Sequence, residues 1–151
     1  MKHFTLLFFL ISIFVLKSTA QEIRTTAAYK YEVAVGRDLN NGKEKQRFPV
    51  TGVIVFSQAA GEDFITFTIG NKVSYNGMVK SKQVHHNGKV TYNIYVIIQE
   101  IQGYKVPIQI FEIYDTEKST YIPDEFQVVV CNRDTGKPVQ LTTYECISRV
   151  Q

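Results

Sequence analysis

Apolar and polar residues alternate along most of the chain, and short turn sequences interrupt the alternation at intervals. Residues 28–36 show the pattern clearly, because Tyr29 and Tyr31 alternate with Lys30 and Glu32. A period of two residues is typical of half-buried β-strands. No helical period extends beyond about two turns. The pattern therefore predicts strands rather than helices.

Eight segments rich in Val, Ile, Tyr, Phe and Thr carry this pattern. They are residues 28–36, 48–57, 63–69, 72–84, 89–99, 104–114, 126–131 and 139–147. Short connections between consecutive strands favour an antiparallel meander, and closure into a barrel removes its exposed edges. The sequence therefore predicts an all-β fold, a small antiparallel meander of about eight strands that closes as an up-and-down (calycin-like) β-barrel. A two-sheet β-sandwich is the alternative.

Three connecting segments leave local choices open. Asn76-Gly77 lies inside a predicted strand, where it predicts either a bulge or a further turn that raises the strand number to about nine. Residues 37–47 form a polar arm with Asn41-Gly42 at its tip, which is a strong hairpin signal. The polar segment 115–125 is compatible with a short helical turn.

The strands 89–99 and 104–114 are apolar on both faces, unlike the other strands. Something must therefore cover their second face, either another part of this chain or a partner. If a partner covers it, the hairpin is a surface for self-association or for another protein. The candidate interface residues are Ile97, Phe111 and Ile113.

The N-terminal residues 1–20 match a cleavable secretory signal peptide. Lys2 gives a basic start, residues 4–16 form an apolar run, and Ser18 and Ala20 are small residues before the expected cleavage point. We expect an exported protein, extracellular or periplasmic, with one all-β domain over residues 21–151. The remaining chain has no further apolar run of about 18 residues, so no membrane span is predicted in it.

Charge and cysteine content narrow the expected function. Lys2 and Lys17 belong to the predicted signal, so removing it lowers the basic residues from 17 to 15 against 14 acidic ones. Nucleic-acid binding is therefore not expected. Cys131 and Cys146 are the only cysteines, and export favours a disulfide between them. A tight hairpin at residues 134–136 would instead place them ~23 Å apart, beyond the ~7 Å that a disulfide allows.

No segment carries a strong catalytic, cofactor or metal signature. Asp134-Thr135-Gly136 has the letters of the aspartic protease signature, but the flanking residues differ, and a turn with a left-handed glycine is predicted. His85 and His86 point to opposite faces of a strand, which disfavours joint metal binding. A Gly-x-Ser-x-Gly elbow and a phosphate loop are absent from the sequence. We expect a protein that is not an enzyme and has no cofactor.

The expected function is an exported, non-enzymatic binding module that holds an apolar or amphipathic small molecule or a protein partner. The candidate ligand-lining residues combine rings, hydroxyls and one carboxylate. They are Tyr29, Tyr31, Tyr92, Tyr95, Glu112 and Tyr114. A closed barrel with an internal cavity of several hundred Å³ would favour a ligand carrier, whereas a filled core would count against it and favour an interaction protein. The lipocalin Gly-x-Trp motif is absent, because the chain has no Trp.

Two alternatives use other parts of the chain. The arm 37–47 is a candidate inhibitory loop that would block a partner protein. The hairpin 89–114 is a candidate self-associating surface. A homo-oligomer is compatible with the second alternative.

Overall fold

The computed structural model describes residues 22–118 and 121–150, so the predicted signal peptide lies outside the described residues. The described chain forms nine strands. They are β1 (Arg24–Arg37), β2 (Glu44–Ala59), β3 (Glu62–Ile69), β4 (Lys72–Asn87), β5 (Val90–Ile101), β6 (Tyr104–Asp115), β7 (Glu125–Cys131), β8 (Pro138–Glu145) and β9 (Ser148–Arg149). Within those ranges no helix has the length and apolar character that crossing a membrane requires.

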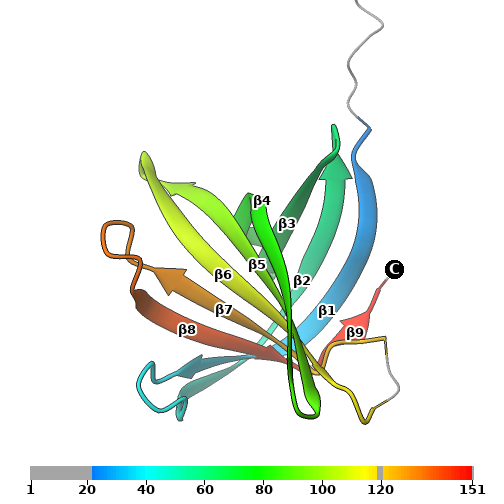
Figure 1. Ribbon diagram of the computed structural model, residues 1–151, viewed down its shortest axis with the longest axis vertical. Coiled ribbons are helices and arrows are strands. Elements are labelled where there is room, and N and C mark those ends of the chain that lie inside the picture. Colours follow the sequence, from blue (N-terminus) through cyan, green and yellow to red (C-terminus); the bar gives the residue numbers. More distant parts are fainter. Residues whose placement is uncertain (1–21, 119–120, 151) are drawn as a thin grey trace, which may run out of the picture.

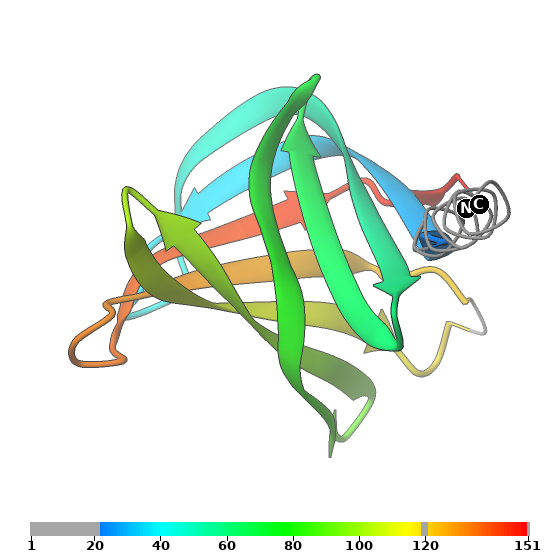
Figure 2. The ribbon, with the colours of Figure 1, turned by 90° about the horizontal axis from the view of Figure 1, so that it is seen from above.

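The sheet closes on itself into an eight-stranded antiparallel barrel, which confirms the predicted barrel over the sandwich (Figures 1 and 2). Each strand from β1 to β8 pairs with its neighbour in sequence, and β8 returns to pair with the second half of β1. β9 adds a short pairing to Tyr29 and Lys30 of β1. Because β8 pairs with β1, the paired parts of these two strands have no free edge.

The connections alternate between two ends of the barrel, as they must in an up-and-down topology. We call one the distal end: it holds the β1–β2, β3–β4, β5–β6 and β7–β8 connections, several of which gather on the left in Figure 1. The terminal end holds the other three connections between β2 and β7, together with the segments that lead to both chain termini. The two candidate sites described below lie at these two ends.

The local choices left open by the sequence resolve toward longer strands. β4 runs without interruption through Asn76 and Gly77, so no turn forms there. A side-chain Cβ on Gly77 would lie 2.9 Å from the carbonyl oxygen of Ile98, so glycine permits this close approach of β4 and β5. The arm 37–47 is also mostly strand, because β2 already begins at Glu44.

The loop at the tip of the β1–β2 hairpin is longer than the two-residue turn that Asn41-Gly42 suggested. The backbone N–H of Asp38 donates to the carbonyl of Lys43 at 2.8 Å, and the N–H of Gly42 donates to the carbonyl of Asp38 at 2.9 Å. Gly42 has a positive φ of 68°. The same pair of backbone bonds recurs in the β7–β8 loop 132–137, at 2.7 and 2.8 Å, so the two loops share one hydrogen-bond pattern.

Aromatic side chains fill the middle of the barrel. Tyr31 packs on Tyr144 with ring centroids 4.7 Å apart, and Phe67 lies 5.4 Å from Tyr144 and 6.1 Å from Phe126. All four side chains are almost completely buried. The middle of the barrel is therefore a packed core, and the open spaces lie nearer its ends.

Tyr31 ties three strands together inside this core. Its hydroxyl donates a 2.6 Å hydrogen bond to the carbonyl of Thr68 on β3, and its ring crosses Gly52 on β2. A Cβ at position 52 would lie 2.3 Å from the Tyr31 hydroxyl oxygen and 2.0 Å from the Thr68 carbonyl oxygen. Only glycine leaves room for this contact.

The predicted disulfide between Cys131 and Cys146 is wrong: both cysteines are free. Residues 132–137 form a tight loop, with Gly136 at a φ of 66°, so the competing turn prediction is correct. Cys131 is buried at the distal end, whereas Cys146 is exposed and follows β8 at the terminal end. The 8 residues of β8 separate the two thiols by ~25 Å at ~3.3 Å per residue.

Candidate functional site

The first candidate site is a buried carboxylate inside the terminal end. Glu112 on β6 faces the barrel interior and is 4% exposed. Its Oε1 accepts a 2.7 Å hydrogen bond from the hydroxyl of Tyr114. Its Oε2 accepts 2.9 Å bonds from the hydroxyl of Tyr95 and from Nδ2 of Asn93. Three neutral donors from β5 and β6 thus hold the carboxylate.

The electrostatics of this cluster keep its tyrosines protonated. Burial first, and then the negative charge of Glu112, raise the pKa of Tyr95 well above its usual value. Burial and the hydrogen bond to Glu112 do the same to the pKa of Tyr114. Tyr29 lies beside them, and burial followed by the charge of Glu112 raises its pKa too. The hydroxyls therefore remain donors to the carboxylate at any physiological pH.

A small cleft opens beside this cluster at the terminal end. Its volume is ≈ 190 Å³, and it reaches Glu112 between Phe56 and Tyr95. The ammonium of Lys82 lies 5.4 Å from the centre of the Tyr95 ring, in cation–π range. This volume is below the range of about 300–1,000 Å³ that is typical of ligand pockets. Both carboxylate oxygens of Glu112 already accept hydrogen bonds from side chains of this chain. The cluster therefore connects β5 and β6 inside the barrel.

The six predicted ligand-lining residues divide among three places. Tyr29, Tyr95, Glu112 and Tyr114 come together in the terminal cluster. Tyr31 lies in the packed middle of the barrel, with its hydroxyl committed to Thr68. Tyr92 pairs with Ile113 and His85 on the outer face, so it does not line the interior.

Sequence reasoning missed Asn93, the amide donor to Glu112. The β5–β6 turn at Gln102-Gly103 sets the register of this hairpin and places Asn93 opposite Glu112. The predicted turn position therefore already contained this contact.

The second candidate site is an apolar cup of ≈ 430 Å³ at the distal end. Its lining residues come from β1, β2, β3, β4 and β8. They are Ala34, Phe48, Pro49, Val50, Ile69, Tyr75, Gln140, Thr142 and Tyr144. Phe48 and Ile69 are 44% and 39% exposed, so apolar surface is open to solvent here. Sequence reasoning identified none of these residues as ligand-lining.

Two tyrosines from the core close the inner side of the cup. Burial is the main cause that raises the pKa of both Tyr75 and Tyr144. Their hydroxyls, with the amide of Gln140 and the hydroxyl of Thr142, are the polar groups of an otherwise apolar lining. A groove of ≈ 340 Å³ adjoins the cup and shares Phe48, Gln140 and Thr142 with it.

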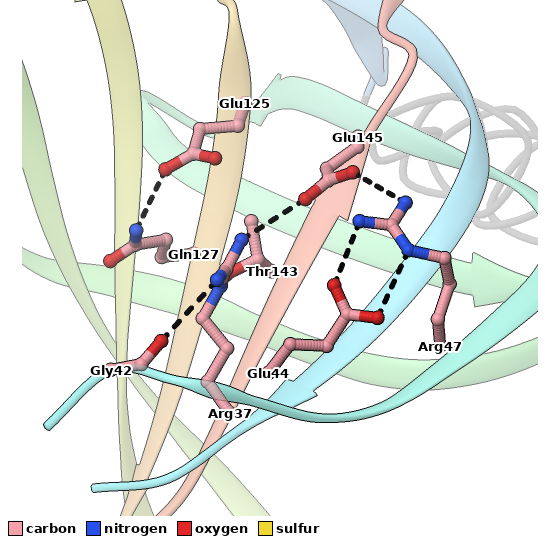
Figure 3. Close-up of polar contacts among 8 residues, drawn as sticks. All are labelled: Arg37, Gly42, Glu44, Arg47, Glu125, Gln127, Thr143 and Glu145. Atoms are coloured by element: carbon pink, nitrogen blue, oxygen red, sulfur yellow. Dashed lines mark hydrogen bonds and ion pairs between the residues drawn. The ribbon is translucent and has the colours of Figure 1, made fainter. Parts of the chain in front are cut away.

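An ion-pair network on the outer surface fixes the hairpin that forms one wall of the cup (Figure 3). Glu145 on β8 binds Arg37 of β1 at 3.1 Å and Arg47 of β2 at 2.8 Å. Arg47 also binds Glu44 at 2.9 Å, and the Nε of Arg37 donates to the Thr143 hydroxyl at 2.7 Å. The arm 37–47 is therefore tied across the seam where β1 meets β8.

The doubly apolar hairpin β5–β6 places its residues differently from the expected grouping. Ile97 pairs with Ile108 and is completely buried inside the barrel, so it is corrected from a candidate interface residue to a core residue. Phe111 points outward beside Ile94, where both are half-buried. Ile113 is also on the outer face but only 8% exposed, and Asp124 of the following connection donates its N–H to the Ile113 carbonyl.

The described residues contain no group of three or more His, Cys, Asp or Glu side chains that could hold a metal ion. His85 and His86 are both exposed on β4, and the ring of His86 hydrogen-bonds the hydroxyl of Thr91 at 2.9 Å.

Comparison of the chain with protein-family models, with curated proteins and with solved structures finds no match.

Proposed function

We propose that this protein is a non-enzymatic binding module that holds a small amphipathic molecule in the distal cup. The observation that carries the proposal is an open apolar cup of ≈ 430 Å³ at the mouth of a closed barrel. Mouths of β-barrels are a common place for ligand sites, and this volume falls within their usual range. The packed core counts against a ligand at the centre of the barrel, so the proposal relies on the cup at the mouth alone.

The lining offers both apolar surface and hydrogen-bonding groups to such a ligand. Phe48, Val50 and Ile69 offer apolar contacts, and each buried CH₂ group contributes about 0.8 kcal/mol. The hydroxyls of Thr142 and Tyr75 and the amide of Gln140 can hydrogen-bond a polar group. These side chains are apolar, hydroxyl or amide groups, which suits retention of a molecule rather than its chemical conversion.

The experiment uses the fluorescent probe 8-anilinonaphthalene-1-sulfonate and its displacement by decanoic acid. Thr142→Phe fills the cup, and Thr26→Phe makes the same change in the cleft at the terminal end. We expect Thr142→Phe to weaken probe binding by on the order of tenfold, a loss of about 1.4 kcal/mol, and Thr26→Phe to leave it unchanged.

Circular dichroism and thermal unfolding check that both variants remain folded. Probe binding that Thr26→Phe weakens and Thr142→Phe does not would move the site to the terminal end and overturn the proposal. Wild-type protein that binds neither probe nor decanoic acid would do the same.

A further inference from the structure

The four connections at the distal end repeat one arrangement of residues. In each, a glycine with positive φ is followed within two residues by an exposed lysine. The pairs are Gly42 and Lys43, Gly70 and Lys72, Gly103 and Lys105, and Gly136 and Lys137. Among the described residues none of these four lysines forms an ion pair. At the terminal end Lys89 follows Gly88 in the same way, but it pairs with Glu117 at 2.6 Å. The charges of the four distal lysines are therefore free to meet a partner.

Two of these lysines have equivalent positions by backbone geometry. The β1–β2 and β7–β8 loops share the same two backbone hydrogen bonds. In both loops the lysine follows the left-handed glycine, and its carbonyl accepts the bond that closes the loop. The fold thus presents Lys43 and Lys137 in the same way on two neighbouring hairpins.

Exposed apolar side chains surround the same four connections. Among the described residues, seven of the eleven exposed large hydrophobic side chains lie at the distal end. They are Leu39, Phe48, Ile69, Val73, Ile101, Tyr104 and Val139. Each of the four connections contributes at least one of them. Single exposed apolar side chains are common on protein surfaces, but a cluster of them indicates a contact surface.

The distal end is also the positive end of the molecule. Residues 36–50, 69–73, 99–106 and 131–141 hold eight Lys or Arg and four Asp or Glu. The rest of the described chain holds seven basic and ten acidic residues. A second copy of this chain is a poor partner for the rim, because two such rims would repel each other.

We propose that the distal rim binds the surface of an anionic lipid bilayer. The four lysines meet lipid phosphates while the apolar side chains between them enter the headgroup layer, as in other interfacial contacts. The rim surrounds the cup, so a protein that binds through the rim turns the open cup toward the bilayer. This inference rests on the proposed function only for the meaning of that orientation. Phe48 and Ile69 belong to both the rim and the cup, but the four lysines belong to the rim alone, so membrane binding and ligand binding can be measured separately.

The first experiment is co-sedimentation with vesicles of phosphatidylcholine containing phosphatidylglycerol, and with pure phosphatidylcholine vesicles. One variant replaces the four rim lysines by Gln (Lys43→Gln, Lys72→Gln, Lys105→Gln and Lys137→Gln). The matched control replaces four lysines of the terminal end (Lys80→Gln, Lys82→Gln, Lys89→Gln and Lys118→Gln). We expect the rim variant to bind anionic vesicles at least about a hundredfold more weakly, and the control to change severalfold at most.

The second experiment places a single fluorescent reporter in a chain that has no Trp of its own. Val139→Trp puts it on the rim and Val84→Trp on the β4–β5 hairpin, at positions that are 54% and 55% exposed. On adding anionic vesicles we expect a blue shift of the emission from Val139→Trp and no shift from Val84→Trp.

Several outcomes overturn the membrane proposal. They are no binding to anionic vesicles, equal loss in both lysine variants, and a blue shift from Val84→Trp alone. A rim that captures an acidic protein but no vesicle would also overturn it. The Thr142→Phe variant separates the two proposals, because it should lose probe binding and keep vesicle binding.

Discussion

The two ends of the barrel use polar and apolar residues in opposite ways. At the terminal end a buried carboxylate, Glu112, receives hydrogen bonds from Asn93, Tyr95 and Tyr114 of the same chain. At the distal end Phe48 and Ile69 leave apolar surface open around a cup of ≈ 430 Å³. A hollow of similar volume at the terminal end, ≈ 450 Å³, is lined by Thr, Asn, Asp, Lys and Tyr side chains. The hydrogen-bonding capacity of the buried Glu112 carboxylate is therefore satisfied within the chain. The proposed ligand site therefore lies at the distal end, where apolar surface remains exposed.

A layer of packed rings separates the two ends and lets each have its own character. Tyr31 and Tyr144 lie in this layer, and Tyr31 is fixed by its bond to Thr68 across Gly52. Changes that open the layer should affect both ends, whereas changes at one end should leave the other intact.

The largest effect is expected from Gly52→Ala, which breaks the layer between the ends. The new Cβ would overlap the Tyr31 hydroxyl and the Thr68 carbonyl, so the ring must move and its hydrogen bond is lost. Overpacking and the lost bond together should lower the free energy of unfolding by about 3–4 kcal/mol. Urea denaturation followed by circular dichroism measures this change.

Gly36→Ala is the matched control for this prediction. A Cβ at position 36 meets only the carbonyl oxygen of Gln46, at an ordinary distance of 3.8 Å. Its effect should stay within about 1 kcal/mol. Similar losses from both substitutions would show that the contact across Gly52 has no special role.

The next effect concerns the terminal end alone. Glu112→Gln keeps the shape of the side chain but turns an amide NH₂ toward groups that are themselves donors. We expect the free energy of unfolding to fall by about 1–3 kcal/mol, the usual cost of leaving a buried polar group without a partner. Probe binding at the distal cup should not change.

Isothermal denaturation and the probe titration, carried out on the same Glu112→Gln sample, measure both quantities. A variant that keeps its stability but loses probe binding would make the terminal carboxylate a ligand-binding group. The contrast between the ends would then be reversed.

The sequence predicts the strands well and the sites only in part, for a physical reason. Alternation and turn residues are local, so the eight strands and the loop at Gly136 were predictable from short windows. The hairpin register is nearly local too, and it brings Asn93 opposite Glu112. The position of Tyr29 beside Glu112 depends on closure of the whole barrel, which no local pattern encodes.

The distal cup shows the same limit more strongly. Ala34, Ile69 and Thr142 line one space although they are far apart in sequence, and each has an ordinary strand environment. The disulfide prediction failed because the expected oxidising compartment was given more weight than the separation of the two cysteines along the predicted hairpin. The turn at residues 132–137 had already placed Cys131 and Cys146 at opposite ends of β8.

A smaller effect is expected at high pH, within the ring layer. Burial raises the pKa of Tyr31 to about 12, from 10.0 in the unfolded chain. Between these values the unfolded chain loses its proton while the folded protein keeps it. The stabilisation that neutral Tyr31 provides is therefore complete below pH 10 and is lost as the pH rises through 12. At pH 11 the loss is about 1.4 kcal/mol for this residue.

Urea denaturation of the wild-type protein and of Tyr31→Phe at pH 8 and pH 11 tests this assignment. The phenylalanine variant starts lower because it lacks the bond to Thr68, but it should lose less stability between the two pH values. Equal losses in the two proteins would place the alkaline sensitivity in other tyrosines, such as those around Glu112.

The smallest perturbation compares the two ends by thiol reactivity, without altering stability. Cys146 is exposed at the terminal end, whereas Cys131 is buried at the distal end and burial raises its pKa. Because the thiolate is the reactive form, Cys131 should resist alkylation until the barrel unfolds.

With N-ethylmaleimide and intact-mass measurement, we expect one rapid addition in native buffer and a second only in denaturant. Cys146→Ser should abolish the rapid addition and Cys131→Ser should leave it unchanged. Native protein that accepts no label before reduction and two labels afterwards would restore the disulfide, and with it a different path for the chain between β7 and β8.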